Sequence, residues 1–374
     1  MHSKRISSRR GVSLTSYGLV VGLIAIVALT VIQSIGSTTD QMFSSVSDRL
    51  QAAGAGGAAS EDTGPALPTP TPTFNFTAHT FTTCSTSGPT GPSQSDCRTQ
   101  YDTSADGNWD EDSGIFTVQG GIQQWLVPVT GSYRIEAKGA IGARTGNHLA
   151  GEGAVIGGTF DLTHGDVLKI LVGQVGLHNC SNVRVYSGGG GGGSFVTMLD
   201  DTPLLIAGGG GGAAQSNNSG DWGDSASTTE TGTRADSAGP LGGTAGDGGQ
   251  VSDGNANNGS SGAGFIGNGR VPTNANNIQT AAQSFLNGGS GGLHSGSGAH
   301  GGFGGGGASG GCGFGGGAGG GYSGGGGGRD INDSGASFRE GGGGGGSFNS
   351  GANPSTFVNP HGSTTSGTVT ITLQ

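Results

Sequence analysis

The sequence predicts a mainly β protein, in which an antiparallel β-sandwich is joined to a bundle of glycine helices and preceded by one N-terminal transmembrane α-helix. Three observations lead to this fold class. Residues 11–39 contain no charged side chain. Short runs in which apolar and polar residues alternate recur from Thr73 to the C-terminal end of the sequence. Glycine supplies 87 of the 374 residues, and several long glycine runs stand directly beside those alternating runs.

The N-terminal segment has the composition of a membrane helix. Val12–Ile35 consists mostly of Val, Ile, Leu, Ala and Gly, and about 20 apolar residues are enough to cross a bilayer. Four basic residues precede Gly11, which predicts a cytoplasmic N-terminus. Apolar residues at helical spacing extend the predicted helix to residue 51. These residues are Met42, Phe43, Val46 and Leu50.

The junction "RRGVSLTSYGLVVGLIAIVAL" places a basic leader, a glycine and an apolar helix in succession. It resembles the Flp/Tad type IVb prepilins. The resemblance implies that a prepilin peptidase cuts between Gly11 and Val12, and that the mature helix packs against other pilin subunits. Family members usually carry Glu-Tyr at mature positions five and six, where this chain has Ser16 and Tyr17. Loss of the glutamate favours a minor or tip subunit. An uncleaved membrane anchor and a cleaved signal peptide are the alternatives.

Residues 52–73 form a predicted linker between this helix, at 12–51, and a domain at 74–374. Ala and Gly dominate the first half of the linker and favour flexibility. The second half carries Pro65, Pro68, Pro70 and Pro72, which favour extended polyproline II structure. The linker is therefore expected to hold the domain away from a membrane or filament surface.

The domain contains repeated strand and turn signals. Paired apolar runs predict hairpins around Thr130-Gly131, His164–Asp166 and Asp200–Pro203. The closing "GTVTITLQ" places Val369, Ile371 and Leu373 on one face of a strand. Several short strands joined by such turns are typical of an antiparallel sandwich.

Glycine-rich polar chains are normally disordered, because they bury too little apolar surface to offset the entropy of ordering. Here the glycine runs alternate closely with strands, which would fix both ends of each run. The ordered alternative is a bundle of polyproline-II-type helices with three residues per turn. Without a Cβ, neighbouring helices could approach closely and pair through N–H···O=C bonds. The runs expected to be ordered are 188–193, 208–212, 324–328 and 341–346.

Several motifs of the domain occur in a fixed order, including "LKILVGQVG", "SGGGGGGSFV", "PLLIAGGGGG" and "GTVTITL". Residues 74–374 resemble the glycine-rich extracellular domain of the anaplastic lymphoma kinase and leukocyte tyrosine kinase receptors. The resemblance implies a TNF-like β-sandwich joined to a polyglycine II bundle, and a domain that binds protein ligands. No kinase motif is present in the sequence. Residues 214–285 match this pattern least and are interpreted as a variable insertion.

The four cysteines all follow the hydrophobic segment, and an even number on the exported side predicts two disulfides. Their spacing fits no zinc site. Cys84 and Cys97 are expected to pair, because two Gly-Pro sequences between them favour a return of the chain. Cys180 and Cys312 are expected to form the second bond, partly by elimination.

The sequence predicts no catalytic, cofactor or metal site. None of the three lysines lies in a phosphate-binding loop, and the eight histidines form no H-E-x-x-H motif. Ser290 in "GGSGG" lacks the preceding buried strand of a nucleophile elbow. His178 and Cys180 are too few for a metal site, and His178 is expected at the surface.

Acidic residues gather between 102 and 112, where oxygen ligands for Ca²⁺ could come together. The spacing matches no EF-hand, so a solvated loop is the other interpretation. Trp109 in this loop is expected to pack in the core. The acidic residues are Asp102, Asp106, Asp110, Glu111 and Asp112.

Beyond Gly36 lie all 25 acidic and 11 basic residues, a net charge of −14, which argues against nucleic acid as a partner. We expect a non-enzymatic, pilin-like bacterial surface protein. It would cross the inner membrane once and then display its domain on a pilus or cell surface, for adhesion or for binding a protein or glycan. The alternative is an uncleaved membrane protein with an exported ligand-binding or structural domain. Ice binding is disfavoured, because the glycine runs form no regular repeat with a flat Thr face.

Overall fold

The computed structural model describes residues 76–101, 109–145, 148–178, 187–214, 222–236, 238–273, 278–333, 336–358 and 365–374. Residues Pro72–Gln374 belong to one compact unit. The leader and the predicted transmembrane helix lie outside the described residues, as does the linker. Among the residues that are described, no helix is long and apolar enough to cross a membrane.

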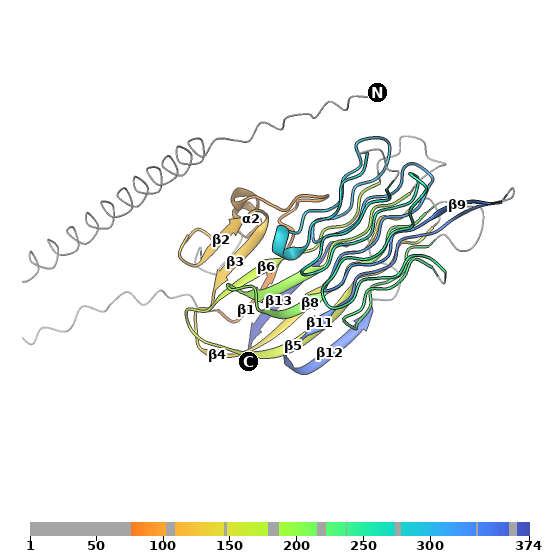
Figure 1. Cartoon of the computed structure of the whole chain (residues 1–374). Helices are drawn as coiled ribbons and strands as arrows, with labels where there is room; N and C mark the ends of the chain where they lie inside the picture. The colour runs from red at the N-terminus through yellow and green to blue at the C-terminus, as the bar shows by residue number, and fades with distance from the viewer. Residues whose placement is uncertain are drawn as a thin grey trace, which may run out of the picture. The chain divides into compact units, whose positions relative to one another are not determined.

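Two antiparallel sheets form the β part of the domain (Figure 1). The five-stranded sheet has the order β1 (Ala78–Phe81), β13 (Thr368–Leu373), β4 (Gly131–Lys138), β5 (Ala154–Leu162) and β12 (Ala352–Val358). The six-stranded sheet has the order β11 (Phe348–Asn349), β8 (Pro203–Ala207), β7 (Ser194–Met198), β6 (Val167–Leu171), β3 (Ile122–Leu126) and β2 (Phe116–Gln119). The predicted mainly β, antiparallel fold class is confirmed.

Other regular elements are short. Helix α2 (Gln94–Tyr101) lies beside β2, and the 3₁₀ helix η1 spans Phe285–Asn287. A separate hairpin, β9 (Asp330–Asp333) with β10 (Ala336–Arg339), projects from the domain (Figure 1). Helices therefore contribute little to the described fold.

The core lies between the inner faces of the two sheets. Val369 and Ile371 are fully buried, with Leu373 packed against them, which confirms the predicted face of β13. In the register of the five-stranded sheet, Ile371 lies opposite Ile135 of β4. The six-stranded sheet contributes the fully buried Trp125 and other inward side chains. The alternation read from the sequence thus corresponds to one buried face per strand.

Two of the three predicted hairpins are instead corners of the sandwich. β3 and β4 lie in different sheets, and so do β5 and β6, although only a few residues connect each pair. The corners lie side by side: the Val127 N–H donates to the Asp166 carbonyl at 2.8 Å, and the Gly165 N–H donates to the Val127 carbonyl at 3.0 Å. The third prediction is confirmed, because β7 and β8 pair directly.

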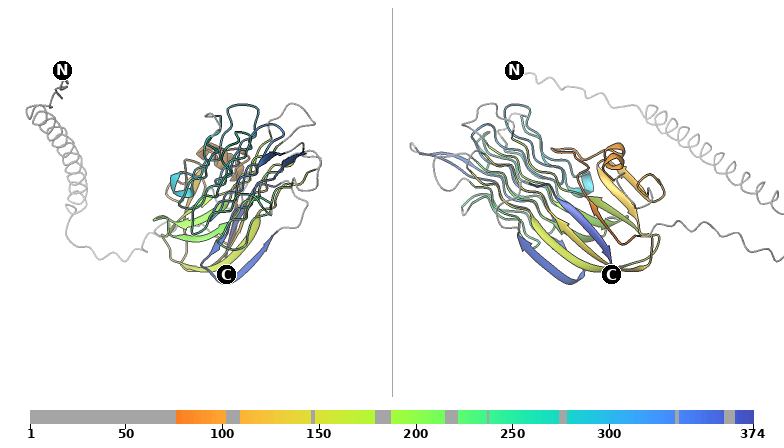
Figure 2. Two further views of the ribbon diagram at one scale, coloured as in Figure 1. Left: turned by 45° about the vertical axis from the view of Figure 1, so that its right-hand side comes forward. Right: turned by 180° about the vertical axis from the view of Figure 1, so that it is seen from behind.

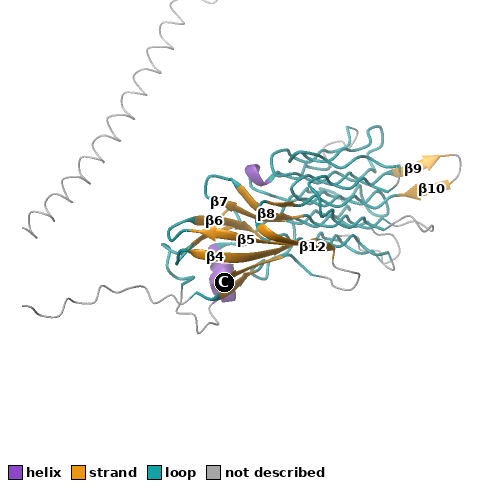
Figure 3. Cartoon of the chain, turned by 90° about the horizontal axis from the view of Figure 1, so that it is seen from below, coloured by secondary structure: helices purple, strands orange, loops and turns teal. Residues whose placement is uncertain are grey.

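The glycine runs are ordered and buried, and they bond to one another and to neighbouring extended segments. We call this part of the domain the glycine array. Figure 3 shows its segments as loops running side by side beyond the strands. The run 188–193 shows the pattern, with N–H to carbonyl distances of 2.8–3.0 Å. Gly188 donates to Ala213, and Gly191, three residues later, donates to Gly210 in the same neighbouring segment. In the same way, Gly189 and Gly192 donate to Leu177 and Gln174, and Gly190 and Gly193 donate to Gly307 and Gly304.

The direction of these hydrogen bonds repeats every three residues, which is the periodicity of a polyproline-II-type helix. Each run is thereby surrounded by several neighbours, and not by two as in a sheet. A Cβ added to Gly190 would meet the backbone of Ala318 and Gly319. The prediction that residues 188–193 are ordered and not a solvated linker is confirmed.

Segments from 214–285 also belong to the glycine array. Ser260 and Ala263 accept hydrogen bonds from Ala318 and Gly321, at 3.1 and 3.2 Å. Both acceptor residues are fully buried. The described parts of 214–285 are therefore built into the array and do not lie apart from it. Their predicted variability is a statement about related sequences and stays a prediction.

A row of aromatic rings joins the outer face of the six-stranded sheet to the glycine array. Each ring stacks on the next, with centroids 4.9–6.3 Å apart. Figure 2 shows the array and the sheets from two further sides. The order of the rings is Phe195, Phe285, Phe265, Tyr322 and Phe348.

Candidate functional site

The sites predicted from sequence fall partly within the described residues. The Cys84–Cys97 disulfide is present, as predicted, and both cysteines are buried. Cys312 is also disulfide-bonded. Cys180 lies outside the described residues, so its pairing with Cys312 stays a prediction. The expected cleavage site at Gly11 and Val12 lies outside them too.

The chain between Cys84 and Cys97 packs against the glycine array. The N–H of Phe303 donates to the Gly88 carbonyl at 2.7 Å, and the N–H of Gly291 donates to the Pro89 carbonyl at 2.8 Å. A Cβ on Gly91 would meet the Cα of Gly121 at 2.5 Å. The disulfide therefore closes a loop that fastens the sandwich to the array.

An aromatic cluster lies beside this disulfide. Trp109 is 2% exposed and packs against Tyr101 and Phe116, which confirms its predicted place in the core. The Tyr101 hydroxyl donates to Gln123 Oε1 at 2.8 Å and accepts the Thr82 N–H at 2.9 Å. Burial raises the pKa of Tyr101 to about 12. A tyrosine so buried and bonded is structural and unsuited to proton transfer near neutral pH.

Part of the predicted acidic loop is described. Arg98 donates to the carbonyl oxygens of Asp110 and Glu111, at 3.2 and 3.1 Å, and pairs with the Glu111 carboxylate at 3.5 Å. No group of three His, Cys, Asp or Glu side chains suited to a metal occurs among the described residues. Asp102 and Asp106 lie outside them, so the calcium interpretation stays untested.

One buried histidine, His294, and the serine considered as a nucleophile, Ser290, have structural positions. His294 Nδ1 accepts the N–H groups of Gly296 and Gly298, at 3.0 and 3.1 Å, and shapes that loop. Ser290 follows η1 and not a strand, so the strand-to-helix turn of a nucleophile elbow is not formed there. His178 is exposed, as expected.

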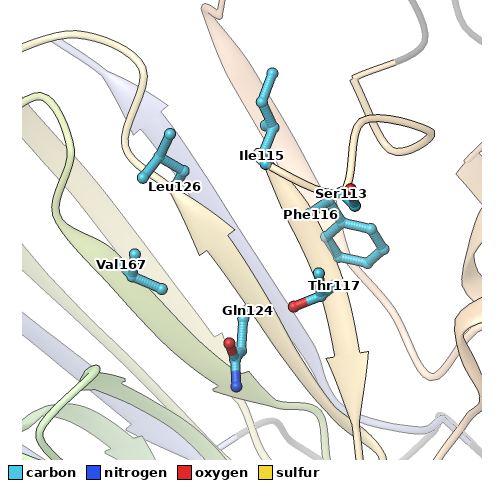
Figure 4. Close-up of a pocket in the computed structure, with 8 residues that line it drawn as sticks. Ser113, Ile115, Phe116, Thr117, Gln124, Leu126 and Val167 are labelled. Carbon is cyan, nitrogen blue, oxygen red and sulfur yellow. The ribbon is translucent and has the colours of Figure 1, made fainter. Parts of the chain in front are cut away.

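One small hollow opens on the six-stranded sheet (Figure 4). Its volume of about 100 Å³ is below that of the usual ligand pockets, about 300–1,000 Å³. It can hold a small side chain, but not a large cofactor. It is lined by Ser113, Gly114, Ile115, Phe116, Thr117, Gln124, Leu126 and Val167, from β2, β3, β6 and the chain before β2.

Polar side chains border the apolar part of this hollow. Thr117 and Gln124 line the hollow from β2 and β3, and Lys169 of β6 is the register partner of Gln124 but is not part of the lining. The Lys169 ammonium pairs with the Asp201 carboxylate at 2.8 Å. Figure 4 shows Thr117 and Gln124 on adjacent strands beside Leu126 and Val167. This mixed surface was not predicted, because the sequence does not reveal which strands are neighbours.

The comparisons with known proteins support a receptor-type domain over part of the chain. No protein-family model matches the chain. A segment of 107 residues is 38% identical to the leukocyte tyrosine kinase receptor of Mus musculus. The match covers 27% of this chain and 11% of the receptor. It supports a partial resemblance to such a receptor over a segment of that length, and it provides no support for the prepilin-like assignment.

Proposed function

We propose that the chain is a non-enzymatic surface protein whose glycine-rich domain binds a protein or glycan partner outside the cell. The partial similarity to a tyrosine kinase receptor is the observation that carries this proposal. We also infer that the domain is a TNF-like sandwich joined to a polyglycine II bundle. The three-residue hydrogen-bond period of the array supports the second part of that inference.

The N-terminal residues support a pilin-like role for the same protein. The basic leader, Gly11 and the apolar run would place a single span in the inner membrane. Cleavage by a prepilin peptidase would then allow entry into a Tad-type pilus, as a minor or tip subunit. The alternative is an uncleaved single-span protein that displays the same domain.

Mass spectrometry of the native protein separates these two forms. The pilin-like form requires a mature chain that starts at Val12. A chain that starts at Met1 would establish the uncleaved anchor, and a start after the apolar run would establish a secreted protein. Either of these outcomes would contradict the pilin-like role and leave the binding function of the domain open.

The hollow on the six-stranded sheet is the proposed contact surface. Val167→Glu places a charge in its apolar part and should abolish adhesion or partner capture by cells that display the protein. Thr80→Glu adds the same charge on an exposed position of the other sheet and should leave binding intact. Equal binding by both variants would exclude the hollow. A wild-type protein that binds no protein or glycan would contradict the proposed function itself.

A further inference from the structure

Residues 222–236 run along the last glycine run, 341–346, and form an outer segment of the array. We call this segment the clasp. The clasp bonds to the run in both directions. The Thr233 N–H donates to the Gly344 carbonyl, and the Thr233 side-chain hydroxyl accepts the Gly344 N–H. Three N–H groups of the clasp donate to the run at 2.8–2.9 Å, from Asp224 to Gly342, from Ser227 to Gly345 and from Thr233 to Gly344.

Three carboxylates gather near the turn at the end of the clasp. The Asp236 N–H donates to Asp224 Oδ2 at 3.0 Å, which links the two ends of the clasp. Glu340 immediately precedes the run 341–346, and a Cβ on Gly239 would lie 2.9 Å from Glu340 Oε2. The side chain of Glu340 therefore reaches the turn that follows Asp236.

Two arginines of the described residues belong to this region, Arg329 and Arg234. Arg329 holds Glu340 through two hydrogen bonds, at 2.7 and 2.5 Å. Arg234 lies on the clasp itself and is exposed. Partial burial penalises the charge on Asp224, and the nearby Asp236 and Glu340 add repulsion. Together these effects raise the pKa of Asp224 to about 6.

We propose that the clasp is strengthened by acid: protonation of the Asp224 carboxyl group, which accepts the Asp236 N–H, holds residues 222–236 more firmly on the glycine run 341–346. The proton removes one negative charge from the cluster, while a carboxyl oxygen still accepts the Asp236 N–H. The closed clasp binds this proton more tightly than an open chain, whose aspartate has its ordinary pKa. Its stability therefore rises as pH falls from 7 towards about 4.

Hydrogen exchange of the full-length protein at pH 7 and pH 5 tests the clasp directly. After correction for intrinsic exchange rates, the opening equilibrium of residues 222–236 should fall about tenfold at pH 5. Asp224→Asn should remove this pH response. At pH 7 this variant should already show the exchange protection that the wild-type protein reaches at pH 5. Asp166→Asn is the matched control, because Asp166 also accepts a backbone N–H, from Thr163 at 2.8 Å, in a loop at the sandwich corner. It should retain the wild-type response.

Two results would overturn the acid-strengthened clasp. The first is wild-type opening that is unchanged, or greater, at pH 5. The second is a folded Asp224→Asn protein that keeps the full pH response. If that variant does not fold, the wild-type titration still decides, and Asp236→Asn provides a second test. Loss of the neighbouring charge should shift the midpoint of the response to lower pH.

Discussion

Glycine is required in the array because it has no Cβ, which allows neighbouring backbone segments to approach closely. Gly191 is buried, and a Cβ there would lie 2.5 Å from the Ala140 carbonyl oxygen and 2.6 Å from the Ile141 carbonyl carbon. Real Cβ atoms do not approach the backbone so closely, so any side chain at this position forces neighbouring segments apart. The glycines of a run are thus individually required, although they look interchangeable in the sequence.

Gly191→Ala should therefore lower the free energy of unfolding by about 1–3 kcal/mol, the usual cost of overpacking a tight interior. Gly114→Ala is the control, because a Cβ there meets only the side chain of Asp112, at 3.1 Å. It should change stability by less than about 0.5 kcal/mol. Denaturant unfolding of both variants measures the difference. Equal stability would mean that the array does not constrain Gly191.

His294 should make the loop at residues 294–300 less stable in acid, whereas the clasp should become more stable in acid. Burial lowers the pKa of His294, and His300 adds to the effect. Protonation would also remove the Nδ1 acceptor that holds the Gly296 and Gly298 N–H groups. Because the folded pKa lies below the ordinary 6.5, this contribution to stability is present above pH 6.5 and is lost as pH falls through the folded pKa.

Hydrogen exchange in residues 294–300 should accordingly increase between pH 7 and pH 5, after correction for intrinsic rates. The same samples report the clasp, which should become more protected. A loop whose protection stays constant or rises at pH 5 would contradict the structural role given to neutral His294.

At the scale of elements, turn signals locate reversals of the chain but do not say where the next strand goes. The turn at Asp200–Pro203 joins neighbouring strands of one sheet. The connections around Thr130-Gly131 and His164–Asp166 carry the chain from one sheet to the other. Each strand alternates in the same way in either case, because it has one face towards the same core.

The disulfide-closed loop is an element whose contribution can be measured. Cys84 and Cys97 are 13 residues apart in sequence, and a closed loop of about 15 residues stabilises a fold by roughly 3 kcal/mol in the chain-entropy model. Replacing both cysteines with serine should lower stability by about that amount and loosen residues 86–92. Denaturant unfolding and hydrogen exchange of the double variant measure the two effects. Unchanged protection of residues 86–92 would show that backbone contacts with the array are sufficient.

At the scale of the whole domain, the sheets and the array form one structure. β7 begins at Ser194, directly after the run 188–193, and β8 ends at Ala207, directly before the run 208–212. The strands thereby fix the ends of the glycine runs, which offsets part of the high entropy cost of ordering glycine.

This continuity predicts one cooperative unfolding transition for Pro72–Gln374. Calorimetry and near-ultraviolet circular dichroism should give the same midpoint, because the buried tryptophans lie in the sandwich while heat absorption reports the whole domain. Two separate transitions would show that the array and the sandwich unfold independently.

The sequence by itself determined the mainly β class, the buried faces of several strands, the ordered glycine runs and the Cys84–Cys97 bond. These features depend on local chemistry: side-chain alternation, the absence of a Cβ, and turn residues between two nearby cysteines. The tertiary structure alone decided which sheet each strand joins, and it placed parts of 214–285 within the array. Alternation identifies a buried face without naming the sheet. A glycine run has no side chains to select its neighbours, so its partners follow from the strands that fix its ends.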